Sequence, residues 1–206
     1  MHIVLYSKPV VQRWLRPLAR LLAGLGITAN QVTVTNILVS LTAYILILMF
    51  LDDRWPLLLI PLALSVRFVL NHVDGILAVE HGMKSAKGLI LNELADCISD
   101  VVLYLPLSLI NGVSPKLVVI MLVLALFSEI TGLLGAVIGA DRRQDGPMGK
   151  RARGVILGLS ALLLGLGITP GVWINMVLLV MLPLLIITSV NRVQASLNQV
   201  AAGQSA

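Results

Sequence analysis

Charged residues are scarce in this chain. Only 12% of its 206 residues are Asp, Glu, Lys or Arg, whereas a soluble domain carries about 25%. Hydrophobic residues make up 58% of the sequence, and the mean hydropathy is +0.97. This balance excludes an ordinary water-soluble domain and predicts an integral membrane protein.

The chain has a single cysteine and no unbroken apolar run at its start. The single cysteine, Cys97, excludes a disulfide within the chain. The first apolar run is interrupted by Arg13, Arg16 and Arg20, so we expect no cleavable signal peptide. We also find no internal repeat in the sequence, which disfavours a transporter built from inverted halves.

Apolar runs long enough to cross a bilayer follow one another along most of the chain. Polar or turn-forming segments separate them, for example Asp52-Asp53-Arg54 and Thr169-Pro170-Gly171. The sequence therefore predicts an all-α integral membrane protein, with one domain over 1–206 and six transmembrane helices. The expected spans are 31–51, 55–80, 88–110, 115–140, 154–168 and 172–191. Beyond residue 191 the chain is polar and rich in small residues, so we expect a frayed end.

Residues 8–25 precede the first span and have a different pattern. Apolar side chains recur there at three- and four-residue spacing, and three arginines lie between them. This pattern predicts an N-terminal amphipathic helix in the headgroup region of the membrane. An ordinary first helix packed on the bundle is the alternative.

The positions of lysine and arginine predict an orientation in the membrane. With the N-terminus inside, 12 of the 15 basic residues fall on the cytoplasmic side. Arg54 and Lys116 lie outside, and Arg67 lies within the membrane. We therefore expect both termini and the loop between the second and third spans at the cytoplasmic face, in a bacterial inner membrane.

The stretch from Asn71 to Asp100, which covers the end of the second expected span and the start of the third, holds five of the ten acidic residues. Asn71 and Asp74 share one helical face, and Asn92, Asp96 and Asp100 share another. Two antiparallel helices with a short polar loop would turn these faces toward each other. Facing carboxylates repel unless a cation or protons lie between them. Oxygen ligands at this density favour Mg²⁺, Mn²⁺ or Ca²⁺ over zinc or copper.

Over 26 positions this segment reads Asn71-x-x-Asp74-Gly75-x-x-Ala78-Val79, then Gly88-x-x-x-Asn92-x-x-x-Asp96. It resembles the signature of the CDP-alcohol phosphatidyltransferase family. That signature reads Asp-x-x-Asp-Gly-x-x-Ala-Arg and, about eight residues later, Gly-x-x-x-Asp-x-x-x-Asp. All the spacings match. Asn71, Val79 and Asn92 stand where the family has its first Asp, its Arg and its third Asp.

The resemblance implies a transferase. Family members move the phosphatidyl group of CDP-diacylglycerol, or of a similar CDP-linked lipid, to an acceptor hydroxyl, and CMP leaves. The resemblance also implies Mg²⁺ or Mn²⁺ between the motif acids and the pyrophosphate, with Asp74 as the strongest metal ligand and Asp96 as the general base. Asn71 and Asn92 can offer amide oxygens, and Glu93 can restore one missing charge. Family members are usually homodimers, and we expect no nucleic-acid partner.

Small residues beside Asp74 indicate where the nucleotide lies. Gly75, Ala78 and Gly88 leave room against the helices, and with the family spacing they predict a CDP-binding pocket. The alternative is packing of helices through small residues.

A basic loop over 141–153 is the most polar part of the chain. Lys150, Arg151 and Arg153 open a helix after a Gly-Pro-Met-Gly turn. Cationic side chains at a helix N-terminus predict an anion site, here for an acceptor phosphate. The charge bias of cytoplasmic loops explains the same residues without any ligand.

Three further ionisable residues lie deep in the predicted spans. Arg67, Asp100 and Glu129 are expected at similar depth on three helices, so we predict a buried charge cluster in which Arg67 neutralises the two acids. A proton or ion pathway is the alternative.

Two other functions compete with the transferase. The chain could be a catalytically weak or inactive relative that binds a CDP-lipid or a partner. It could also be a small transporter that uses the deep charge cluster. For the transferase, the sequence leaves the acceptor open among small polyols, polyol phosphates and lipids.

Overall fold

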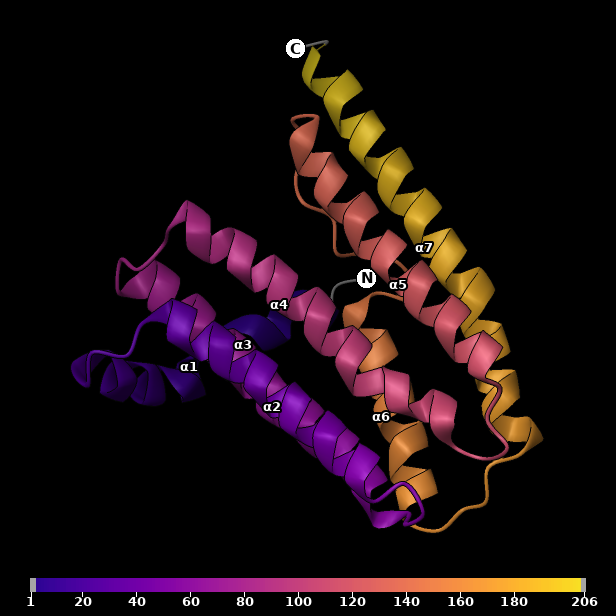
Figure 1. Cartoon of the computed structure of the whole chain (residues 1–206). Helices are drawn as coiled ribbons and strands as arrows, with labels where there is room; N and C mark the ends of the chain where they lie inside the picture. Colours follow the sequence, from indigo (N-terminus) through magenta and orange to yellow (C-terminus); the bar gives the residue numbers. More distant parts are fainter. Residues whose placement is uncertain (1–2, 205–206) are drawn as a thin grey trace. The chain divides into compact units, whose positions relative to one another are not determined.

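The computed structural model describes residues 3–204, with side chains described from residue 11 to residue 202 (Figure 1). This part of the chain consists of helices joined by turns, so the predicted all-α class is confirmed. In chain order the elements are α1 (Ile3–Gly24), α2 (Ala29–Met49), the 3-10 helix η1 (Trp55–Leu58), α3 (Leu59–Glu80), α4 (Ala86–Tyr104), the 3-10 helix η2 (Leu105–Leu109), α5 (Pro115–Val137), α6 (Lys150–Gly165) and α7 (Val172–Gln204).

Four stretches of the described chain are long and apolar enough to cross a membrane. They are Ala29–Met49, Trp55–Glu80, Pro115–Val137 and Val172–Ala202. The remaining two of the six expected spans correspond to α4 and α6, which do not share this property. Helix α4 carries Lys87, Glu93, Asp96 and Asp100, and α6 has only 16 residues and begins Lys-Arg-Ala-Arg. The six-span topology therefore stays a prediction.

One compact unit comprises the described residues up to Leu46 together with Pro61–Leu103. Apolar side chains of α1, α2 and α3 form its core, and Ala19, Val32, Val73 and Leu77 are among the most buried. These contacts hold α1 against the cytoplasmic end predicted for α3. The predicted helix over 8–25 is present within α1, and its position at the membrane interface stays a prediction.

A second compact unit comprises Ile47–Ile60 and the described residues from Tyr104 onward. Helices α5 and α7 lie side by side in it (Figure 1). Glycines on α5 allow this approach, because a Cβ at Gly135 would lie 2.5 Å from Ser196 Oγ on α7. The frayed end expected from residue 191 is wrong, since α7 continues to Gln204. Burial of Arg192 and Ser196 against α5 holds this last part in the helix.

Candidate functional site

Helices α3 and α4 are joined by a hydrogen bond between two residues of the sequence motif. Asn71 on α3 donates from Nδ2 to Asp96 Oδ1 on α4 over 3.3 Å. The i, i+3 spacing on α3 places Asp74 on the same face as Asn71. The predicted meeting of the two polar faces is therefore present in the first compact unit.

Asp74 is almost completely enclosed, with 7% of its surface exposed. The hydroxyl of Thr33 on α2 donates to Asp74 Oδ2 over 3.3 Å, and Thr33 itself is 3% exposed. A carboxylate buried in this way needs hydrogen bonds or a cation to replace its lost hydration. Thr33 is a neutral donor, and it shares its hydroxyl hydrogen between Asp74 and the carbonyl oxygen of Ala29, 3.1 Å away.

A second side chain of α2 reaches the motif. Asn36, fully buried, donates from Nδ2 to Asn71 Oδ1. Because Asn71 in turn donates to Asp96, the three side chains form a continuous chain of hydrogen bonds from α2 through α3 to α4. Helix α2, which lies outside the sequence motif, therefore contacts the motif residue Asn71 through Asn36.

Arg67 lies one helical turn before Asn71 and contacts two acids of α4. Its Nη2 is 3.0 Å from Asp100 Oδ1 and 3.9 Å from Asp96 Oδ1. The guanidinium is 3% exposed. The predicted neutralisation of Asp100 by Arg67 is present in the structure. The same guanidinium also lies near Asp96. Arg67 and Asp100, predicted as a separate buried cluster, are therefore in contact with the sequence motif.

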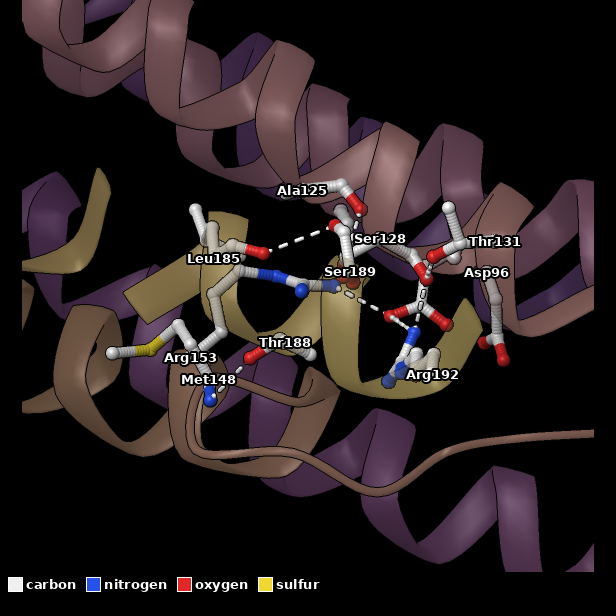
Figure 2. A network of polar contacts seen from close by, with 12 residues as sticks. Asp96, Ala125, Ser128, Thr131, Met148, Arg153, Leu185, Thr188, Ser189 and Arg192 are labelled. Carbon is white, nitrogen blue, oxygen red and sulfur yellow. Dashed lines mark hydrogen bonds and ion pairs between the residues drawn. The ribbon is translucent and has the colours of Figure 1, made fainter. Parts of the chain in front are cut away.

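Glu129, the third member of the predicted charge cluster, lies on α5 in the second unit and has other partners. Its Oε1 is 3.4 Å from Arg153 Nη2 and 3.6 Å from Arg192 Nη1. Arg192 also donates from Nη1 to Ser128 O and from Nε to Asp145 O at 2.9 Å. Figure 2 shows Arg153, Arg192 and Ser128 in this network. We predicted Arg67 as the partner of Glu129, and nothing in the sequence favoured Arg153 or Arg192 instead.

The predicted acceptor-phosphate residues at the start of α6 do not share one environment. Arg153 is 1% exposed and paired with Glu129, whereas Arg151 is exposed and Lys150 is half-buried. A phosphate at Arg153 would have to compete with Glu129 for a buried guanidinium. Of these three residues, an anion from solvent can therefore reach Lys150 and Arg151 more easily than Arg153.

The small residues of the motif differ in what surrounds them. Among the described residues, nothing lies within 4 Å of a Cβ built on Gly75, so space is open beside this part of α3. A Cβ on Gly88 would lie 2.6 Å from Asn30 Oδ1, so this glycine gives room to the start of α2. Val79, in place of the family arginine, is 74% exposed.

The donor set suits a hard cation in part. Within the described residues, no group of three or more carboxylate, imidazole or thiol side chains gathers closely enough to hold a metal ion alone. Mg²⁺ is commonly bound by one or two carboxylates, with waters and substrate phosphates completing its six ligands. Asp74 and Asp96 fit that pattern, with Glu93 and Asn92 half-buried on the same helix as Asp96.

Sequence reasoning missed Thr33 and Asn36 on α2, and Arg192 on α7. A signal for the first two was present, because Thr33, Asn36 and Ser40 recur at i, i+3, i+7 inside an apolar span. Polar residues on one face of such a span point to a bundle interior. Arg192 lay beyond the expected end of the last span and was counted only as a cytoplasmic charge.

Comparison with known proteins gives a family model and a curated relative. The model for CDP-alcohol phosphatidyltransferase matches residues 26–200. The chain is similar to "Inner membrane protein YnbA" of Escherichia coli (strain K12), with 36% identity over 190 residues, which is 92% of this chain and 94% of that protein.

Two solved structures with the same fold are of an enzyme of Mycobacterium tuberculosis. Phosphatidylinositol phosphate synthase (PgsA1) with CDP-DAG bound matches with a TM-score of 0.72 and 20% identity, over 89% of this chain and 92% of that chain. The same enzyme in complex with manganese and citrate matches with a TM-score of 0.72 and 20% identity, over 87% of each chain.

Proposed function

Because the chain belongs to the CDP-alcohol phosphatidyltransferase family, we propose that it transfers a phosphatidyl or similar phospho-alcohol group from a CDP-linked lipid to an acceptor hydroxyl. The observation that carries this proposal is the pairing of α3 and α4 through Asn71 and Asp96, at the spacing of the family motif. The related synthase binds CDP-DAG, which supports CDP-diacylglycerol as the donor.

In the proposed reaction, the acceptor oxygen attacks the phosphorus that carries the lipid alcohol. The bond between this phosphorus and the oxygen bridging to CMP breaks, and CMP leaves with that oxygen. Asp96 takes the proton of the acceptor hydroxyl as a general base. The amide of Asn71 and the guanidinium of Arg67 hold the Asp96 carboxylate in position. Open space beside Gly75 leaves room for the cytidine nucleotide.

Asp74 and Asp96, with Glu93 and the amide oxygen of Asn92, would hold Mg²⁺ or Mn²⁺. A divalent cation at this place neutralises the pyrophosphate oxygens and the leaving CMP. The PgsA1 structure with manganese supports this choice of ion. Thr33 contacts Asp74 through a neutral hydroxyl, which adds no charge beside this carboxylate.

For the acceptor we propose a small polyol, a polyol phosphate or a lipid alcohol. Lys150 and Arg151 are the basic residues with the easiest access for an acceptor phosphate, since Arg153 is paired with Glu129. We further propose a homodimer, with both termini and the active site at the cytoplasmic face of a bacterial inner membrane.

The test is release of CMP by purified protein. CDP-diacylglycerol is incubated with Mn²⁺ and a panel of polyols, polyol phosphates and lipid alcohols, and Asp96→Asn serves as the control. We expect one acceptor to give CMP in Mn²⁺, none in EDTA, and none with Asp96→Asn.

A binding protein without turnover is the second candidate, because Val79 offers no charge where the family has arginine. Tight binding of CDP-diacylglycerol with no CMP from any acceptor would favour it.

A further inference from the structure

Asn71 occupies the position at which the family motif has an acidic residue, and its contacts differ from those of a metal ligand. Its side chain is joined to Asn36 on one side and to Asp96 on the other. Both atoms of the Asn71 amide are therefore engaged with protein partners.

The directions of these hydrogen bonds follow from the chemistry of the end group. An ionised carboxylate only accepts hydrogen bonds, so Asn71 must turn its NH₂ group toward Asp96. Its carbonyl oxygen then faces Asn36, which must present its own NH₂ group. Asn36 is 0% exposed on the apolar helix α2 and is committed to this arrangement.

An aspartate at position 71 would behave differently. It would place a second carboxylate 3.3 Å from Asp96 Oδ1, where the asparagine now donates, and two carboxylates at that distance repel unless a cation lies between them. The amide removes this repulsion. Arg67 Nη2 also lies 3.9 Å from this Oδ1 atom, so one hydrogen bond and one longer ion-pair contact restrain the same oxygen of Asp96.

We propose that Asn71 is a positioning residue for Asp96 and not a metal ligand, and that Asn36 acts with it by fixing the orientation of the Asn71 amide. This inference rests on the proposed transferase function and assigns a role to a departure from the family motif. It also assigns a role to Asn36, which lies outside the motif. The cation is left to Asp74, Asp96 and their neighbours on α4.

The experiment compares Asn71→Ala, Asn36→Ala and the double variant with the wild type. Ser40→Ala is the matched control, because Ser40 is also fully buried on α2 and its hydroxyl donates to the carbonyl of Asn36 in its own helix. Three quantities are measured: kcat for CMP release, the KM for CDP-diacylglycerol, and the Kd for Mn²⁺.

We expect each single variant to lose kcat by about tenfold or more, because a misplaced general base is costly in rate. The double variant should be no slower than Asn71→Ala, since both changes break one chain of bonds. The KM should stay near the wild-type value, and the Mn²⁺ Kd should shift to the same extent in Asn71→Ala and Asn36→Ala, because both act through Asp96, itself a proposed ligand. Ser40→Ala should match the wild type. If Asn36→Ala fails to fold, Asn36→Leu replaces it in the comparison, because leucine has a side chain of similar shape to that of asparagine but one that cannot hydrogen bond.

The proposal is overturned if Asn71→Ala weakens Mn²⁺ binding strongly while Asn36→Ala leaves it unchanged, because Asn71 would then be a ligand. It is also overturned if Asn36→Ala retains full kcat. Absence of CMP release from the wild type would contradict the proposed function instead. In that case the melting temperatures decide: non-additive losses in the double variant support the Asn36–Asn71 pair, and additive losses contradict it.

Discussion

Asp74 and Asp96 are the two motif carboxylates that the chain retains, and their surroundings differ. Asp74 receives a hydroxyl from Thr33, which leaves its negative charge uncompensated by that contact. Asp96 receives an amide from Asn71 and lies 3.9 Å from a guanidinium nitrogen of Arg67. The printed contact of Asp74 is with a neutral group, whereas Asp96 lies near a cation.

The first prediction at this scale concerns Arg67. Arg67→Leu removes the cation between Asp96 and Asp100 and leaves buried carboxylates without it, which costs about 3–5 kcal/mol of unfolding free energy. We expect poor expression or early melting in detergent, measured by thermal unfolding.

Arg16→Leu is the control for Arg67→Leu. The Arg16–Glu80 ion pair has a nitrogen–oxygen distance of 2.9 Å, and the two side chains are 45% and 35% exposed. Exposed pairs contribute about 0–1 kcal/mol, so this variant should melt close to the wild type. Normal melting of Arg67→Leu would contradict the stabilising role, and lost activity in that case would place Arg67 in the site.

Sequence patterns predicted single residues well where they share a helix. The four-residue spacing of Asp96 and Asp100 placed both on one face, and Arg67 meets both. Partners from distant helices could not be predicted, because they depend on how helices pack. Glu129 pairs with Arg153 and Arg192 for this reason, and Asn36 was not seen as a partner of Asn71.

At the scale of elements, α5 and α7 are held together by glycines and buried polar side chains. A Cβ at Gly132 would overlap the carbonyl oxygen of Arg143, which belongs to the loop after α5. This loop is fixed to α7, because Arg143 Nη2 donates to Gln199 Oε1 over 2.8 Å. The polar tail that the sequence led us to expect as frayed is therefore part of the packing.

The second prediction tests this packing. Gly132→Ala should destabilise the protein by about 1–3 kcal/mol, because the backbone of the loop must move to admit the methyl group. Gly75→Ala is the matched control, since nothing in the described chain lies within 4 Å of its Cβ position. Thermal unfolding compares the two variants. Equal melting temperatures would contradict the packing account.

The third prediction concerns the effect of Gly75→Ala on substrate binding. If the open space beside Gly75 receives the nucleotide, the added methyl group should raise the KM for CDP-diacylglycerol without lowering stability, because alanine is the better helix former. Steady-state kinetics of CMP release measure this effect. An unchanged KM in a fully folded variant would remove Gly75 from the proposed pocket.

Helix positions were the most predictable elements, since apolar length and turn residues determine them locally. The expected spans at 31–51 and 115–140 correspond to α2 and α5 within a few residues. Apolar length and turn residues do not decide whether α4 and α6 cross the membrane. Both contain charged residues whose cost depends on the partners that pair with them, as Arg67 does for Asp100.

At the scale of the whole molecule, the fourth prediction concerns orientation. The distribution of 15 basic residues predicts Lys84 at the cytoplasmic face and Lys116 at the other face. Lys84→Cys and Lys116→Cys, each in a Cys97→Ser background, are labelled from outside intact cells with an impermeant maleimide. We expect labelling at 116 and none at 84, and the reverse pattern would contradict the orientation.

The central claim is that the acidic pair on α3 and α4 is a metal-dependent site for a CDP-linked lipid. A pyrophosphate does not approach bare carboxylates in a medium of low dielectric constant without an intervening cation. The most direct measurement is the affinity of purified protein for CDP-diacylglycerol, in Mn²⁺ and in EDTA, for the wild type and Asp74→Asn. The account predicts tight binding only for the wild type in Mn²⁺. Equal binding in EDTA, or wild-type binding by Asp74→Asn, would contradict it.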